Sequence, residues 1–206
     1  MSFWTSQEMA SEVLGLIPNK STVNLGIGLP SLIADIYTDK ELVLHSENGV
    51  LGVSGRPKKG TASHQIINAA KETIGICDGA SFFDSSVSFS MIRGGHIDVA
   101  VLGGMQVDVN GSLANWKVPG RKITGMGGAM DLVYGPKTVI VMMSHLNKDN
   151  EKLVDKCTLP ITGKNCVDFI VTEQGVFAPK SKKFKIIKLS DEDNFLKHQM
   201  SDLYKQ

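Results

Sequence analysis

The stretch Glu41–Gly52, which reads ELVLHSENGVLG, is the part of the sequence around which the rest is organised. Strand-forming residues 42–44 lead into Ser46-Glu47-Asn48-Gly49, and a second apolar pair follows. An Asn-Gly dipeptide readily adopts positive φ, so the chain can turn sharply straight after Glu47. The sequence therefore predicts a carboxylate at a strand-to-turn corner, over the end of a sheet, where open α/β sheets keep their sites.

Four roles are open for Glu47 at this point. The carboxylate can act as a nucleophile, a general base or a metal ligand, or it can only accept hydrogen bonds from the amides of the turn. His45 precedes Glu47 by two residues, so on a strand it shares the same face and can support that side chain. No GxSxG elbow is present, which argues against a serine hydrolase.

The composition is that of a soluble globular chain with one sizeable core. It has 206 residues, of which 42% are hydrophobic and 21% charged, and its net charge is +1. We expect a single domain spanning residues 1–206, with the last sixteen or so residues as a loosely docked tail. No basic face indicates nucleic acid, and no apolar run or signal sequence indicates a membrane.

The cysteines and histidines point to neither disulfides nor a metal site. Cys77, Cys157 and Cys166 are odd in number and form no CxxC pair, so we interpret them as reduced thiols of a cytoplasmic protein. The five histidines show no HxH or HxxxH spacing, so no metal ion is expected.

Strand-like runs alternate with helical patterns along the chain, which predicts an α/β fold with an open, mostly parallel sheet flanked by helices. A hairpin turn is expected at Asp78-Gly79. The tail from residue 191 is interpreted as a short helix or a frayed segment. Helices are expected at 5–17, 31–37, 65–72, 84–93 and 148–157, and strands at 21–25, 42–44, 97–102, 138–143, 168–172 and 185–189.

Two glycine loops stand out. Gly26-Ile27-Gly28 lies between a strand and a helix, an arrangement that can bind an anion, but Ser31 replaces the third glycine of the dinucleotide fingerprint, so NAD is not expected. Gly125–Gly128 holds three glycines in four positions, a density that no helix tolerates easily. We expect a loop there whose amides closely face another group.

Seven blocks in order, across about residues 6–178, closely resemble the β-type (B) chain of family I CoA-transferases, the 3-oxoacid and butyrate:acetoacetate type. That resemblance implies a ribose-phosphate-isomerase-like α/β fold. The blocks are VNLGIGLP (23–30), HSENGVLG (45–52), INAAKET (67–73), FDSSVSFSMIRGGHID (83–98), LANWKVPG (113–120), GMGGAMDLV (125–133) and KCTLPITG (156–163).

The resemblance implies that Glu47 is the nucleophile of a ping-pong reaction. It attacks an acyl-CoA, a mixed anhydride forms, and the CoA thiolate returns to give a glutamyl-CoA thioester that an incoming acid then reverses. A glutamate is ionised at neutral pH without help from a base. Motif alignment implies that Gly128 supplies an oxyanion-stabilising amide. Further substrate- or CoA-binding residues are implied in the same motifs: Asn24, Gly26, Gly28, Ser46, Asn48, Gly49, Gly125 and Gly127.

The resemblance also implies a partner and substrates. Coenzyme A is a substrate here, so no cofactor is expected, and the other reactants are short carboxylic acids such as acetoacetate. An A-type partner is expected in an α2β2 heterotetramer. Ser54 departs from the usual glycine after the nucleophile turn. Three alternatives stay open: a sugar-phosphate or effector-binding module on the related fold, a non-catalytic subunit, and a thioesterase.

Overall fold

The protein is described from a computed structural model, which covers residues 3–37, 40–120, 125–148, 150–191, 195 and 202–205. Across these ranges, no helix is both long and apolar enough to cross a bilayer. The helices are α1 (Ser6–Leu16), the 3-10 helix η1 (Leu29–Asp35), α2 (Ser85–Arg93) and α3 (Ala129–Leu132).

The largest sheet has ten strands, and two small sheets accompany it. The ten strands are β1 (Thr22–Leu25), β2 (Val43–Ser46), β3 (Val50–Val53), β4 (Ile76–Phe82), β5 (Val99–Leu102), β8 (Thr138–Met142), β12 (Phe169–Thr172), β13 (Gly175–Lys180), β14 (Lys183–Leu189) and β15 (Tyr204–Lys205). The small sheets comprise β6 (Gln106–Asp108), β7 (Leu113–Ala114) and β11 (Leu153–Val154), and β9 (Leu146–Asn147) with β10 (Asn150–Glu151).

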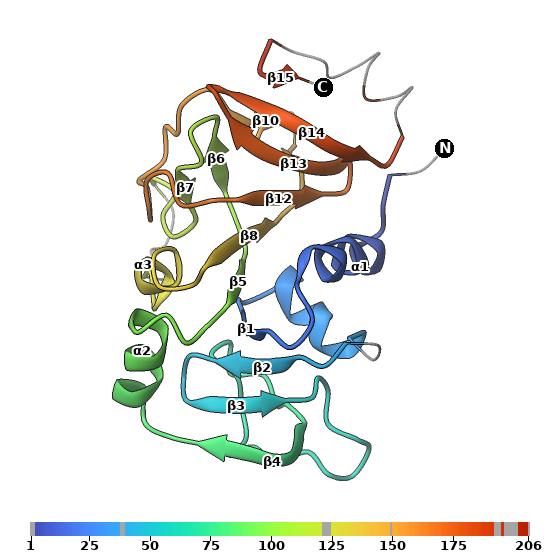
Figure 1. The fold of residues 1–206 in the computed structure, drawn as a ribbon, viewed down its shortest axis with the longest axis vertical. Helices are drawn as coiled ribbons and strands as arrows, with labels where there is room; N and C mark the ends of the chain where they lie inside the picture. Colours follow the sequence, from blue (N-terminus) through green and yellow to red (C-terminus); the bar gives the residue numbers. More distant parts are fainter. Residues whose placement is uncertain are drawn as a thin grey trace.

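The strand order in the large sheet is β15-β14-β13-β12-β8-β5-β1-β2-β3-β4 (Figure 1). The five central strands, from β12 to β2, pair in parallel. β13 and β14 on one side and β3 and β4 on the other add antiparallel pairs. The predicted α/β class with a mostly parallel sheet is confirmed, and the antiparallel flanks are what the sequence did not indicate.

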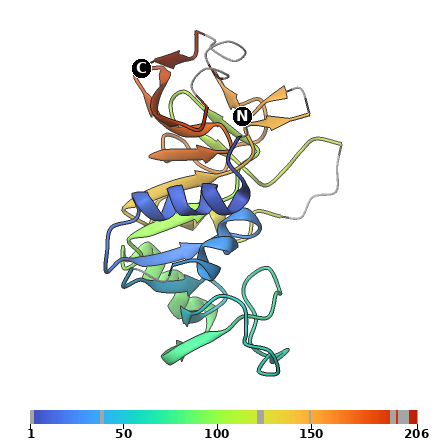
Figure 2. The ribbon, with the colours of Figure 1, turned by 90° about the vertical axis from the view of Figure 1, so that its right-hand side faces the viewer.

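Two hydrophobic cores lie on opposite faces of the central strands. In β5, Val99 and Val101 belong to the core that includes α1, whereas Ala100 and Leu102 belong to the core that includes α2 and α3. Figures 1 and 2 show α1 on one face and α2 and α3 on the other. All four β5 side chains are buried, as expected of a strand covered on both faces.

The helix starts follow from local capping. Thr5 is the N-cap of α1: its hydroxyl accepts a hydrogen bond from the Glu8 amide at 3.3 Å, and the Glu8 carboxylate accepts one from the Thr5 amide at 2.7 Å. Asp84 caps α2 by accepting from the amides of Ser86 and Val87. These bonds satisfy donors that a helix leaves free in its first turn.

Three local predictions were wrong. Residues 65–72 form turns instead of a helix, because the Asn68 side-chain oxygen accepts from the amides of Ala70 and Glu72 and so competes with helical bonding. Asp78-Gly79 lies inside β4 and not at a hairpin turn. Residues 148–157 contain β10 and β11, because parallel pairing of β11 with β6 outweighs their polar pattern.

The C-terminal strands enclose a buried polar contact. His145 is fully buried, and its ring lies 3.1 Å from the Thr172 hydroxyl and 3.0 Å from the Tyr204 hydroxyl. Phe195 is buried beside both aromatic rings. Part of the expected tail therefore docks on the core, whereas residues 192–194, 196–201 and 206 lie outside the described residues.

His145 makes stability depend on pH. Burial, aided by the charge of Lys152, lowers the pKa of His145 to about 4. The unfolded chain binds a proton below about pH 6.5 that the folded chain excludes, so this stability is complete above pH 6.5 and falls as the pH drops toward 4. We expect a loss of about 2 kcal/mol between pH 6.5 and pH 5 from this residue.

Urea unfolding at pH 7.5 and pH 5.0 measures that loss. In a His145→Gln variant the difference between the two pH values should shrink by about 2 kcal/mol, because Gln does not titrate in this range. An unchanged pH dependence in the variant would contradict the assignment.

Candidate active site around Glu47

Glu47 lies at the corner between β2 and β3, where the sequence predicts it. The turn is closed by a hydrogen bond of 3.0 Å from the Gly49 amide to the Ser46 carbonyl. Gly49 has φ +116°, and a Cβ there would lie 1.9 Å from the Phe83 carbonyl oxygen. Only glycine fits this turn, so the geometry that presents Glu47 depends on Gly49.

Asn24 reaches Glu47 from the neighbouring strand. β1 and β2 are parallel, and their register places Asn24 opposite His45. The Asn24 amide nitrogen donates to Oε2 of Glu47 at 3.2 Å. Among the described residues, no other group donates to this carboxylate, so Oε1 is free and no turn amide is bound. The turn-capping role considered for Glu47 is therefore not what holds it.

Gly128 comes close to Glu47 from a distant part of the chain. It is the N-cap of α3 with φ −84°, and a Cβ built on it would lie 3.6 Å from Cγ of Glu47 and 2.6 Å from the Phe89 ring. Its carbonyl accepts from the amides of Asp131 and Leu132. Within the described ranges, nothing accepts a hydrogen bond from the Gly128 amide, which leaves a donor available beside the carboxylate.

Ser46 and Asn48 fasten a neighbouring segment to the nucleophile turn. The buried Ser46 hydroxyl accepts from the Ala69 amide at 3.1 Å, and the Asn48 side chain donates to the Ile67 carbonyl at 2.7 Å. Both residues lie at the predicted site. Their side chains are engaged with the protein itself, so these contacts explain their presence without a ligand.

The other predicted glycines lie at varying places around the site. Gly26 packs against β5, and its amide donates to the Val101 carbonyl at 2.8 Å. Gly28 has φ +85° at the start of η1, and its carbonyl accepts from the Ser31 hydroxyl. Gly125 and Gly127 have positive φ and open space around the Cβ position, so the structure does not bring them against Glu47.

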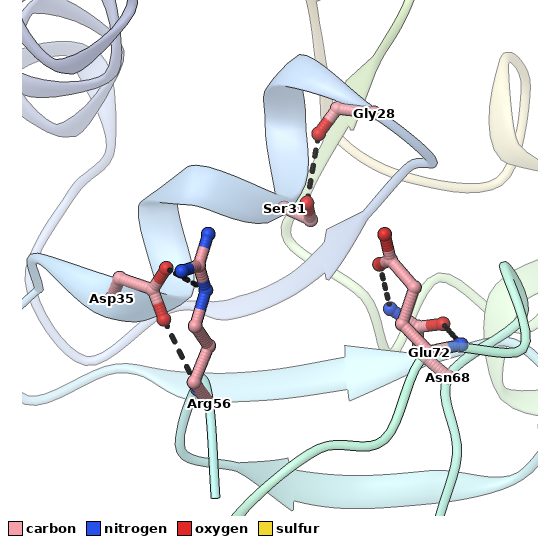
Figure 3. Close-up of polar contacts among 6 residues, drawn as sticks. All are labelled: Gly28, Ser31, Asp35, Arg56, Asn68 and Glu72. Carbon is pink, nitrogen blue, oxygen red and sulfur yellow. Dashed lines mark hydrogen bonds and ion pairs between the residues drawn. The ribbon is translucent and has the colours of Figure 1, made fainter.

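A cavity of about 720 Å³ opens beside this corner, with His45 and Ser46 in its wall. Figure 3 shows its polar edges: Arg56 pairs with Asp35, and Asn68 donates to Glu72. The Arg56–Asp35 nitrogen–oxygen distance is 3.3 Å. The charged and titratable residues of the lining are Asp35, Arg56, His64, Lys71 and Glu72, besides His45.

Sequence reasoning missed the contribution of α2. Ser88 is fully buried and its hydroxyl lies 3.0 Å from Nε2 of His45, while Phe89 contacts the position of Gly128. The apolar spacing of α2 gave no sign that one of its serines faces the site. His45 itself is buried, and burial lowers its pKa to about 4, so the ring is neutral at physiological pH.

Comparison with known proteins agrees with these features. The profile of the family described as Coenzyme A transferase matches residues 7–192. The B chain of the succinyl-CoA:3-ketoacid coenzyme A transferase of Helicobacter pylori is 52% identical over 170 residues, which is 82% of each chain. The B chain of the 3-oxoadipate CoA-transferase of Pseudomonas putida is 45% identical over 190 residues, 91% of this chain and 89% of its own.

A solved structure shows the same fold in a longer protein. The acyl-CoA transferase apoenzyme of Escherichia coli O157:H7 superimposes with a TM-score of 0.73 at 18% identity, over 100% of this chain and 42% of its own. The present chain thus spans less than half of that protein. Together with the family profile and the relatives that share about half their residues with it, this shows that the chain is a B-type member of the coenzyme A transferase family.

Proposed function

We propose that this chain is the catalytic B-type half of a CoA-transferase that exchanges CoA between succinyl-CoA and a 3-oxoacid such as acetoacetate. The observation that carries the proposal is the carboxylate of Glu47, which has one bound and one free oxygen and lies beside the unpaired amide of Gly128. That arrangement suits acyl transfer through a covalent intermediate on Glu47.

The proposed chemistry runs in two halves. Oε1 of Glu47 attacks the thioester carbon, the carbon–sulfur bond breaks, and CoA leaves as a thiolate from a mixed anhydride. The thiolate then attacks the side-chain carbonyl carbon of Glu47, which releases succinate and leaves a glutamyl-CoA thioester. An incoming carboxylate reverses both steps. The Gly128 amide is placed to stabilise negative charge that develops next to Glu47.

The cavity beside the nucleophile turn suits the remote part of CoA. CoA carries several phosphate charges, and Arg56, His64 and Lys71 contribute basic groups to the lining. Binding energy gained far from the thioester can orient the reacting carbon against Glu47. The acyl donor and acceptor are inferred from the relatives: one is named for succinyl-CoA and 3-ketoacids and another for 3-oxoadipate.

We propose that an A-type partner completes the enzyme in an α2β2 assembly. The relatives with the same extent are named as the B members of two-chain enzymes, and the longer acyl-CoA transferase has more than twice the length needed for this fold. The isolated chain is then expected to be inactive. A sugar-phosphate-binding role is less favoured, because the site offers a free carboxylate oxygen and a free amide suited to acyl transfer.

Mass spectrometry of the Glu47 peptide tests the proposal. The chain, co-expressed with its A-type partner, is mixed with acetoacetyl-CoA or succinyl-CoA and no acceptor acid. We expect a CoA-sized adduct on Glu47 that disappears when an acceptor is added, whereas a thioesterase would release free CoA without an acceptor. An intact Glu47 peptide, with acyl-CoA binding shown separately, would contradict the covalent mechanism.

A further inference from the structure

We propose that His45 and Ser88 are positioning residues for Glu47: acting through Asn24, they hold Oε2 in place and direct the free Oε1 toward the substrate. This inference rests on the proposed role of Glu47 as nucleophile. It assigns a task to a buried histidine and a buried serine that the reaction itself does not use.

Four side chains form one chain of hydrogen bonds that ends at the nucleophile. The Ser88 hydroxyl lies 3.0 Å from Nε2 of His45, and Nδ1 of His45 lies 3.1 Å from the amide nitrogen of Asn24. The same nitrogen lies 3.2 Å from Oε2 of Glu47. Ser88, His45 and Asn24 are each no more than 1% exposed, so solvent does not compete for these bonds.

The chemistry of the partners fixes every donor in this chain. A carboxylate only accepts, and the His45 carbonyl, 3.4 Å from the Asn24 nitrogen, also only accepts. Asn24 must therefore present its amide hydrogens to this side, and Nδ1 of His45 must accept. The proton of the neutral ring then resides on Nε2, from which it is donated to Ser88.

One oxygen shows that the arrangement is not the most comfortable one for the protein alone. Oδ1 of Asn24 is buried and has no partner among the residues that the structure describes. Rotating the amide would place that oxygen against the Glu47 carboxylate. A buried acceptor without a donor is unfavourable, so the orientation is explained by the bond to Glu47 and by the acceptor that His45 provides.

Packing keeps the imidazole from leaving its place. The His45 ring stacks on Phe83, with ring centroids 6.2 Å apart and planes 13° from parallel. The Phe83 amide donates to the Gly49 carbonyl at 3.0 Å, so the stacking partner is itself tied to the nucleophile turn. Ser88 comes from α2, whose start is fixed by the Asp84 cap. The ring is thus held by two elements that also frame the site.

The test compares the rate at which the Glu47 thioester forms in single-turnover experiments. The variants are His45→Leu, which removes both ring contacts, and Ser88→Ala, which removes only the outer one; each is co-expressed with the A-type partner. We expect the rate to fall between about 10- and 100-fold, with KM for the acyl-CoA little changed, because the nucleophile is misplaced while the CoA contacts remain. His45→Gln, which retains an acceptor and a donor, should restore much of the rate.

Ser90→Ala is the matched control, since Ser90 lies on the same helix, is exposed, and its hydroxyl donates to the Ser86 carbonyl. It should form the thioester at the wild-type rate. If His45→Leu or Ser88→Ala does so too, the positioning role of that residue is wrong. Failure of the wild-type enzyme to form any adduct on Glu47 would instead refute the proposed function.

Discussion

We expect Glu47→Gln to reduce CoA transfer by about 10³-fold or more, because an amide cannot form the anhydride and thioester that the proposed reaction requires. The fold should be unaffected. A glutamine oxygen can still accept the hydrogen bond from Asn24, and no other described residue donates to this side chain. Steady-state transfer from succinyl-CoA to acetoacetate measures the rate, and thermal unfolding checks the fold.

Glu41→Gln is the matched control for that experiment. Glu41 is exposed, and its carboxylate forms a surface ion pair with Lys20 at 3.7 Å. Such a pair contributes little to stability, so the control should keep both the transfer rate and the melting temperature. A transfer rate of Glu47→Gln close to that of this control would exclude Glu47 as the nucleophile.

Gly128→Ala is expected to lower the transfer rate by about 100-fold. Its φ of −84° accepts alanine, so the backbone itself is not strained by the change. The new methyl group would lie 2.6 Å from the Phe89 ring and 3.6 Å from Cγ of Glu47. Because the ring is packed, the loop must shift and carry the amide of residue 128 away from the reacting centre.

A double variant separates this displacement from general damage. Phe89→Leu shortens the opposing side chain, so Gly128→Ala combined with Phe89→Leu should recover a large part of the rate lost in Gly128→Ala alone. Gly15→Ala is the control, because a Cβ there meets nothing within 4 Å on helix α1. If the rate of Gly128→Ala equals that of this control, the proposed amide contribution is wrong.

The sequence determined the features that depend on a few consecutive residues. The Asn-Gly turn after Glu47, the capping box of α1 and the Asp84 cap of α2 were all predicted, because caps and tight turns satisfy backbone donors within one or two turns of chain. The buried strand at 97–102 was also evident, since an unbroken apolar run indicates burial on both faces.

Ordered motifs allowed the sequence to go further than these local signals. They placed the nucleophile candidate at Glu47 and an amide donor at Gly128, and the structure brings these two residues together. Motif order also identified the family that the comparisons show. Asn48 and Ser46 were expected to bind substrate, but their side chains bond to neighbouring backbone, which no motif indicates.

Only the tertiary structure decided which distant groups meet. His45 and Ser88 are 43 residues apart, and neither the strand pattern around one nor the helix pattern around the other predicts their contact. Residues 148–157 had a helical pattern but form strands, since β11 gains a partner in β6. Pairing and burial between segments outweigh local preference when a long-range partner is available, and a sequence on its own does not reveal that partner.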